Sequence, residues 1–247
     1  MPNAKNIFGF HAITSRIRQH PESVKEIYLD ANRNDQRAQN LIAIAENQGI
    51  RVSMCNASKL NNMAGTTHHQ GVIAAILTIQ NPITIESILE ATHDKTLLLL
   101  LDGVKDPYNL GACLRIADAF GAQAVIVPKD NAVGLTSTVY KVASGSAESI
   151  PLISVTNFSR TIRLLKQQGI WVIGAAVDAN DTLDNIKLSG ATAWFLGSEG
   201  DGMRKLTQEN CDQLVRIPMI GNVNSLNVSV AAGICLFETL RQRNQRK

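Results

Sequence analysis

The hydrophobic and polar positions of this chain alternate between two periods from one end to the other. Apolar residues at i, i+3 and i+4 predict helices, and short apolar runs predict strands. In the first third, helices are expected at 10–19, 35–48 and 57–63, and strands at 26–29, 51–54 and 72–77. This pattern predicts a small α/β unit of about 75 residues, which is enough for a core of its own.

The pattern breaks after Thr78, where Asn81-Pro82 disfavours a helix before the proline. One short helix, at 85–91, is expected in the segment that follows. We therefore expect three parts: a first domain at 1–78, a linker at 79–95 and a second domain at 96–247.

The second domain reads as a longer α/β series. Leu97–Leu101 is entirely apolar, which is typical of a parallel strand covered on both faces. Further strands are expected at 124–127, 152–155, 171–175, 193–196 and 215–217, and helices at 110–120, 136–143, 158–168, 206–213 and 227–243. Such an alternation implies an open, mostly parallel sheet that binds its ligands at the carboxyl ends of its strands.

Charge is unevenly spread along the chain. Residues 1–78 hold eight Lys and Arg against five Asp and Glu, whereas residues 79–247 hold sixteen of each. A basic first domain fits a polyanion-binding module beside a neutral core. The alternative is that the excess of three positive charges in residues 1–78 arose by chance.

Other chemistry is limited by what the sequence lacks. No apolar run is long enough to cross a bilayer, and the start lacks the apolar core of a signal peptide, so a cytoplasmic protein is expected. No metal is expected, because no two of the four cysteines have CxxC spacing and no metal-ligand cluster is apparent. His68 and His69 precede a strand and are interpreted as loop residues or as an RNA contact.

Three loops at predicted strand ends carry the candidate chemistry. The first follows Leu101 and contains Asn109, which can start a helix, and Arg115. The second, Gly197-Ser-Glu-Gly-Asp-Gly202, has the order G-x-x-G-x-G, which differs from the dinucleotide fingerprint, and it surrounds Glu199. For the first loop, the simpler interpretation is a capping Asn and a solvated Arg. For the second loop, it is a flexible glycine turn.

The third loop leads from Ile217 into the terminal helix. It places Asn222, Asn224, Ser225 and Asn227 directly before an apolar stripe at helical spacing. One capping residue would satisfy the first turn of the helix. Four polar side chains there suggest a site that grips a ligand, because backbone donors and the positive end of the helix dipole converge at this point.

Together, three segments resemble the motifs of the SpoU family of RNA ribose 2′-O-methyltransferases, in the SPOUT superfamily. They are Asn109-Leu-Gly-Ala-Cys-Leu-Arg115, Phe195 through Met203, and Ile217-Pro-Met through Ser225-Leu-Asn-Val-Ser-Val-Ala-Ala. The front, from Asn6-Ile-Phe-Gly-Phe-His-Ala to about residue 78, is similar to the family's small L30e-like RNA-binding domain. Within the family, the likeness is greatest to bacterial enzymes that methylate a guanosine of large-subunit (23S) ribosomal RNA.

The resemblance implies a fold, a cofactor and an assembly. It implies S-adenosylmethionine as methyl donor, a deep trefoil knot in the second domain, and a homodimer with active sites completed across its interface. Because true knots are almost absent from proteins, the pattern of elements alone would not suggest one.

The resemblance also assigns residues. Arg115 is the residue tied to catalysis, with Asn109, Glu199, Ser225 and Asn227 orienting it and the ribose. Backbone groups near Gly197, Ile217 and Leu226 would hold the cofactor. In the first domain we expect phosphate contacts from Arg16, Arg18, Arg33, Arg37 and Arg51.

Two alternatives stay open. One is a transfer-RNA guanosine 2′-O-methyltransferase, against which the L30e-like domain argues. The other is a non-catalytic RNA-binding protein of ribosome assembly.

Overall fold

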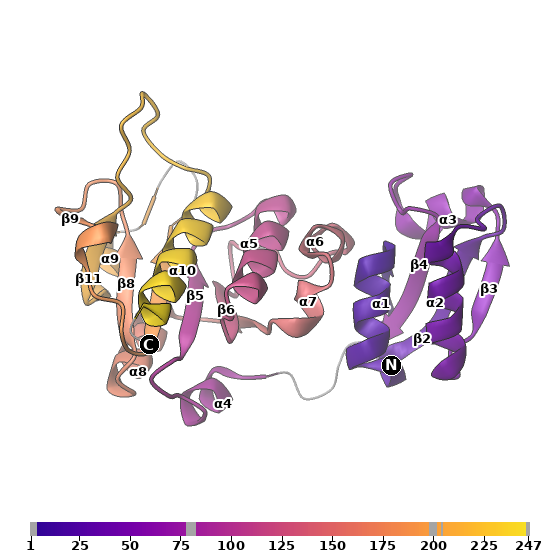
Figure 1. The fold of residues 1–247 in the computed structure, drawn as a ribbon, viewed down its shortest axis with the longest axis horizontal. Coiled ribbons are helices and arrows are strands. Elements are labelled where there is room, and N and C mark those ends of the chain that lie inside the picture. Colours follow the sequence, from indigo (N-terminus) through magenta and orange to yellow (C-terminus); the bar gives the residue numbers. More distant parts are fainter. Residues whose placement is uncertain (1–3, 78–82, 198–201, 204, 246–247) are drawn as a thin grey trace. The chain divides into compact units, whose positions relative to one another are not determined.

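A computed structural model describes residues 4–77, 83–197, 202–203 and 205–245 (Figure 1). Contacts between residues divide the chain into two compact units. The first comprises 1–82 together with 135–149, and the second comprises 83–134 and 150–247.

The first unit is built on a four-stranded mixed sheet. Its strand order is β1 (Ala4–Phe8), β4 (Val72–Leu77), β2 (Val24–Asp30) and β3 (Val52–Cys55). Strand β4 runs antiparallel to both β1 and β2, whereas β2 and β3 are parallel. The sequence pattern did not predict β1, because only two of its five residues are large and apolar.

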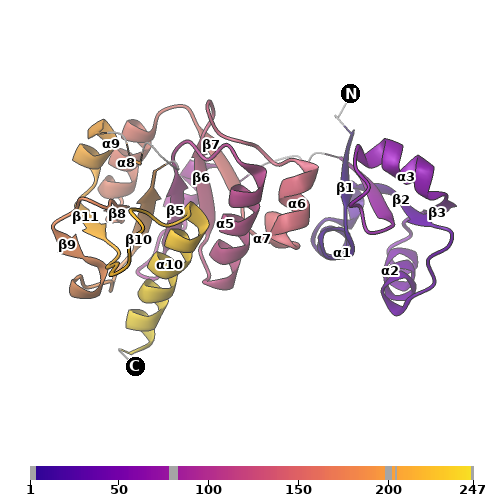
Figure 2. The same cartoon turned by 90° about the horizontal axis from the view of Figure 1, so that it is seen from above.

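Helices α1 (Phe10–Gln19), α2 (Gln36–Asn47) and α3 (Ala57–Ala64) lie where the sequence pattern predicts helices. Helices α1 and α2 are in contact (Figures 1 and 2). Helix α3 packs on the sheet through a cluster formed by Phe8, Leu60 and Ile73. A single 3₁₀ turn, Pro21–Ser23, connects α1 to β2.

Two short helices from the middle of the chain complete this unit. They are α6 (Ser137–Ala143) and α7 (Ser146–Ser149), and both contact α1. Arg16 of α1 forms an ion pair with Glu148 of α7, with Nη1 2.6 Å from Oε2 and both side chains at most 2% exposed. Burial raises the pKa of Glu148 although the Arg16 guanidinium opposes that shift. Because removing one partner would leave a buried charge uncompensated, this pair fastens the inserted segment to the first unit.

The second unit contains a seven-stranded sheet in which every observed pairing is parallel. Its order is β7 (Leu152–Val155), β6 (Ala124–Pro128), β5 (Leu97–Leu101), β10 (Thr192–Leu196), β8 (Trp171–Ala175), β11 (Gln213–Arg216) and β9 (Asp181–Thr182). The prediction of an α/β fold with a mostly parallel sheet is confirmed.

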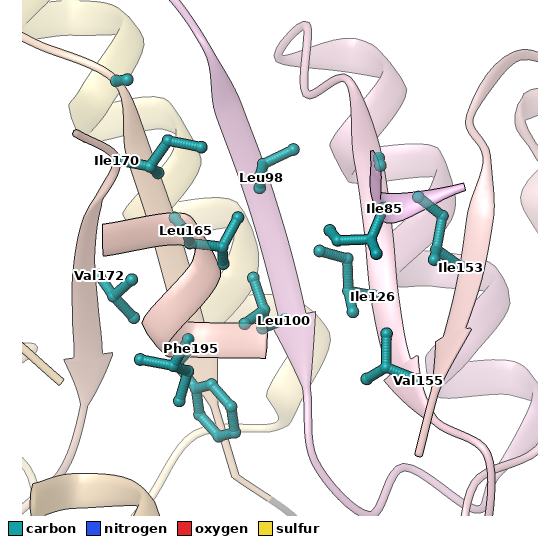
Figure 3. Packing of buried hydrophobic residues seen from close by; sticks show 14 of the residues in the cluster. Ile85, Leu98, Leu100, Ile126, Ile153, Val155, Leu165, Ile170, Val172 and Phe195 are labelled. Atoms are coloured by element: carbon teal, nitrogen blue, oxygen red, sulfur yellow. The ribbon is translucent and has the colours of Figure 1, made fainter. Parts of the chain in front are cut away.

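Five helices and a 3₁₀ turn accompany this sheet in the described ranges. They are α4 (Ile85–Glu90), α5 (Pro107–Ala119), α8 (Phe158–Gln167), α9 (Lys205–Asn210), α10 (Val228–Asn244) and Leu183–Asn185. On one side of the sheet, Leu98, Leu100 and Phe195 pack against Leu165 of α8 (Figure 3). The rings of Phe158 and Phe195 meet edge to face with centroids 5.1 Å apart.

Among the boundaries that differ from the sequence pattern, two have a clear physical reason. Helix α5 begins at Pro107 rather than at Leu110, because Asp106 caps it and proline suits the first helical position. Helix α9 ends at Asn210 rather than at Gln213, because the residues from Gln213 onward pair with β8.

The terminal helix α10 packs against α5 and against the central strand β10 (Figure 2). Trp194 of β10 donates its indole N–H to the Thr239 hydroxyl at 2.9 Å, and both residues are fully buried. One turn further toward the end of the helix, Arg243 donates to the carbonyls of Lys95, Thr96 and Gly190. These bonds fix the last turns of α10 on the sheet.

None of the helices in the described ranges is long and apolar enough to span a membrane.

The Trp194–Thr239 bond gives a stability prediction. Thr239→Val keeps the side-chain shape but leaves a buried indole N–H without an acceptor, so we expect the free energy of unfolding to fall by about 1–3 kcal/mol. Thr239→Ser keeps the hydroxyl and loses one methyl group, which costs about 0.8 kcal/mol. Urea unfolding followed by tryptophan fluorescence reports on the second unit, because Trp171 and Trp194 both lie there. A valine variant at least as stable as the serine variant would contradict the prediction.

Candidate active site

The second unit has a cavity of about 600 Å³ at the carboxyl ends of β8, β10 and β11. Its wall combines apolar side chains with a few polar ones, as ligand sites usually do. The lining residues are Ala175, Ala176, Val177, Asp178, Leu196, Gly197, Gly202, Met203, Gln208, Ile217, Met219, Ser225, Leu226, Asn227, Val228 and Ala231.

The structure brings together the three residues expected to hold a cofactor. Gly197, Ile217 and Leu226 all line the cavity, although they follow or lie between different elements. A Cβ atom at Gly197 would overlap the backbone of Gly202 and Met203, so glycine is required for this close approach. Parallel strand ends gather these loops, because every strand of the sheet points the same way.

Asn227 joins two of the predicted motifs. Its Nδ2 donates to Oδ1 of Asn109 at 2.9 Å. Its Oδ1 accepts from the backbone N–H and the hydroxyl of Ser229 and thereby caps α10. One amide therefore caps the terminal helix, lines the cavity and binds the first turn of α5.

The structure describes two of the three remaining predicted site residues, Arg115 and Ser225. Arg115 is exposed on α5, six residues beyond Asn109, which corresponds to about 9 Å along the helix axis. Ser225 lines the cavity. Glu199 lies outside the described residues, so its position carries no argument.

One stretch of the cavity wall escaped the sequence interpretation. Residues 175–178, at the end of β8, line the cavity and include Asp178. The sequence signal for them is small. The segment Gly174-Ala-Ala ends β8, and β8 lies between β10 and β11, the two strands that lead into the candidate loops at Gly197 and Ile217. Gln208 also lines the cavity and lies outside the three motifs, whereas Met219 lies in the third motif but was given no role.

The five arginines expected to contact RNA fall into different environments. Arg18, Arg37 and Arg51 are exposed. Arg33 is half-buried, pairs with Asp35 and lies over the ring of Phe10 at 4.6 Å.

Arg16 is buried, and besides Glu148 its guanidinium binds the Ser23 hydroxyl and the Leu77 carbonyl. With the guanidinium inside the first unit, a phosphate contact by Arg16 is disfavoured.

His69 has a structural place in the first unit. Its Nδ1 accepts from the N–H of Gly71 at 3.0 Å, and its Nε2 lies 2.8 Å from Oδ1 of Asn61. These bonds suit a neutral ring that donates from Nε2, and burial lowers the pKa of His69 in agreement. Within the described ranges, no group of three or more His, Cys, Asp or Glu residues is placed to hold a metal ion.

The close approach at Gly197 gives a binding prediction. Gly197→Ala forces the backbone of Gly202 and Met203 away from the cavity wall. We expect the affinity for S-adenosylmethionine, the cofactor that the sequence resemblance implies, to fall roughly tenfold or more, or by at least about 1.4 kcal/mol, in calorimetric titration. Gly134→Ala is the matched control, because nothing lies within 4 Å of a Cβ atom there. Equal affinity of the two variants would contradict the prediction.

Two family models match the chain. The SpoU rRNA Methylase family matches residues 96–237, which is more than half of the chain. The model for RNA 2′-O ribose methyltransferase substrate binding matches residues 6–82.

Relatives and solved structures agree with these matches. A Nitrosomonas europaea protein described as 23S rRNA (guanosine-2′-O-)-methyltransferase RlmB is 58% identical and covers 100% of this chain and 95% of its own length. A protein of the same description from Ralstonia nicotianae is 51% identical over 99% of this chain and 98% of its own. A crystal structure described as an RNA 2′-O ribose methyltransferase has a TM-score of 0.83 at 26% identity, covering 98% of this chain and 89% of its own.

The fold alone is shared with a more distant structure, the SpoU methyltransferase AviRb from Streptomyces viridochromogenes in complex with the cofactor AdoMet. That chain has a TM-score of 0.82 at 21% identity, covering 98% of this chain and 91% of its own. With the family model matched over the whole parallel-sheet region, the chain belongs to the SpoU rRNA methylase family.

Proposed function

We propose that this protein transfers a methyl group from S-adenosylmethionine to the ribose 2′-OH of a guanosine in 23S ribosomal RNA. The hydrogen bond between Asn109 and Asn227 at the cavity carries the proposal, because it assembles two catalytic motifs of the family beside a ligand-sized cavity. The relatives described as acting on this RNA are similar over nearly the whole chain.

The cavity suits the proposed cofactor. Leu196, Ile217 and Leu226 provide apolar wall on which an adenine ring can lie. Backbone groups of Gly197, Ile217 and Leu226 supply donors and acceptors for its edge. When bound, S-adenosylmethionine supplies a methyl group already activated by a sulfonium, so the protein mainly has to position the reactants.

Arg115 has two conceivable roles in that positioning. A guanidinium is planar, permanently charged and able to bind phosphate with two parallel bonds. Removing the hydroxyl proton is a harder task for it, because arginine scarcely deprotonates in proteins. We favour a clamp on the phosphate beside the target ribose, with Asn109, Ser225, Asn227 and Glu199 orienting the ribose and Arg115 by hydrogen bonds.

Substitution of Arg115 tests this role. We expect Arg115→Ala to lower methyl transfer to 23S rRNA roughly 10²–10³-fold, as loss of a preorganised charged donor does elsewhere. Affinity for S-adenosylmethionine should be unchanged in calorimetric titration. Arg115→Lys keeps the charge but not the paired geometry and is expected to recover only part of the rate. Normal methyl transfer by the alanine variant would refute the assignment.

We further propose that the first unit supplies RNA affinity through Arg18, Arg33, Arg37 and Arg51. Three of these are exposed, whereas the guanidinium of Arg33 is oriented by Asp35 and by the ring of Phe10. Deleting residues 1–78 is a poor test of this idea, because residues 135–149 pack in the same unit and would lose the contacts that hold them, including the Arg16–Glu148 pair.

Charge removal in the full chain is the cleaner experiment. Arg18, Arg37 and Arg51 are changed together to Gln, and binding to 23S rRNA is measured at several salt concentrations. The salt slope should fall by roughly one for each phosphate that these arginines bind in the wild type, with cofactor affinity unchanged. Changing the exposed Arg160 and Arg163 of α8 to Gln is the control. Equal reductions in both variants would contradict a specific role for the first unit.

Three further proposals come from family membership. We infer that the second unit contains the deep trefoil knot of the superfamily, which suits the return of α10 from β11, next to the edge of the sheet, to the central strand β10. The first unit, with its mixed sheet, is the L30e-like domain. The protein acts in the cytoplasm as a homodimer, for which the exposed Val230 and Phe237 of α10 provide apolar surface.

A further inference from the structure

Tyr108 is an exposed aromatic residue beside the candidate active site. It is 64% exposed, so its ring is open to contact with a ligand. It directly precedes Asn109, whose amide binds Asn227 at the cavity. An exposed ring one residue from this bond requires a functional explanation more than an isolated surface residue would.

The start of α5 holds Tyr108 rigidly. Asp106 caps the helix by accepting the backbone N–H of Tyr108 at 3.1 Å, and Pro107 fixes the first helical position. The ring therefore projects from a fixed backbone and has only two side-chain torsions. Binding a ligand against it costs little conformational entropy.

Tyr108 and Arg115 lie on one face of α5. Positions 108, 112 and 115 have the spacing i, i+4 and i+7, which places them in a single stripe of a helix. The opposite face is buried through Leu110, Cys113, Leu114 and Ala117. Tyr108 and Arg115 are seven residues apart, which places their Cα atoms about 10 Å apart along the axis. Between them the stripe holds only Gly111, which is buried, and the small side chain of Ala112.

This stripe is chemically complementary to one ribonucleotide. It offers an aromatic face at one end and a permanent positive charge at the other. Between them lies only the short side chain of Ala112, with the amide of Asn109 beside it. A nucleotide has a flat base, a ribose and an anionic phosphate in the same order. Aromatic side chains stack on bases, and guanidinium groups bind phosphates.

We propose that Tyr108 positions the substrate RNA by stacking on the base of the nucleotide whose phosphate is bound by Arg115. The stack holds the ribose over Asn109 and Asn227, so that its 2′-OH faces the cavity. This inference rests on the proposed function, since it assumes an RNA substrate at this site. An aromatic face tolerates every base, so Tyr108 supplies affinity and placement rather than selection of guanine.

The test compares Tyr108→Ala with Tyr108→Phe, which keeps the ring. Steady-state methyl transfer to 23S rRNA transcribed in vitro gives kcat and KM, and calorimetry gives the affinity for S-adenosylmethionine. Tyr108→Ala should raise the KM for RNA roughly 5- to 100-fold, while kcat changes less and cofactor affinity stays at the wild-type value. Tyr108→Phe should behave as the wild type does. Ile83→Ala, at another exposed apolar residue of the second unit, is the control.

Three outcomes are separable. An unchanged KM in Tyr108→Ala, with active wild-type protein, overturns the stacking role and leaves the proposed function intact. A change in oligomeric state of Tyr108→Ala, seen by light scattering, overturns it in favour of a contact between two copies of the chain. A wild type that transfers no methyl group to the RNA defeats the proposed function, and the inference with it.

Discussion

The return of the last helix to the centre of the sheet is the constraint on which the candidate site depends. Helix α10 packs on β10 and α5, where Trp194 binds Thr239 and Asn227 binds Asn109. The two asparagines are 118 positions apart in the chain, so only the fold brings their amides together. Without this docking the loop from Ile217 to Asn227 would lose its fixed end, and the cavity would lose one of its walls.

A second consequence concerns how the two units are connected. Residues 135–149 belong by their contacts to the first unit, so the chain passes between the units at three places rather than one. The buried pair of Arg16 and Glu148 holds this inserted segment. Breaking a buried pair by removing one partner costs about 3–5 kcal/mol, so the insertion is a stable part of the first unit rather than a loose loop.

Much of the second unit could be predicted from the sequence, because its signals are local. The strand at 97–101 is entirely apolar, and the strand-to-loop order places Gly197, Ile217 and Leu226 at one edge of the sheet. Other features depend on long-range contacts that no local pattern records. Arg16 looks like any surface arginine until Glu148 packs beside it, and β1 becomes a strand only by pairing with β4. The wall formed by Ala175–Asp178 was missed for the same reason.

The central claim is that this protein methylates a guanosine ribose of 23S rRNA. Mapping ribose methylation over the whole 23S rRNA, in cells with and without the gene, tests it most directly. We expect a single guanosine 2′-O-methyl group to disappear on deletion and to return when the intact gene is restored. Identical methylation maps in the two strains, or loss of a methyl group from transfer RNA instead, would contradict the claim.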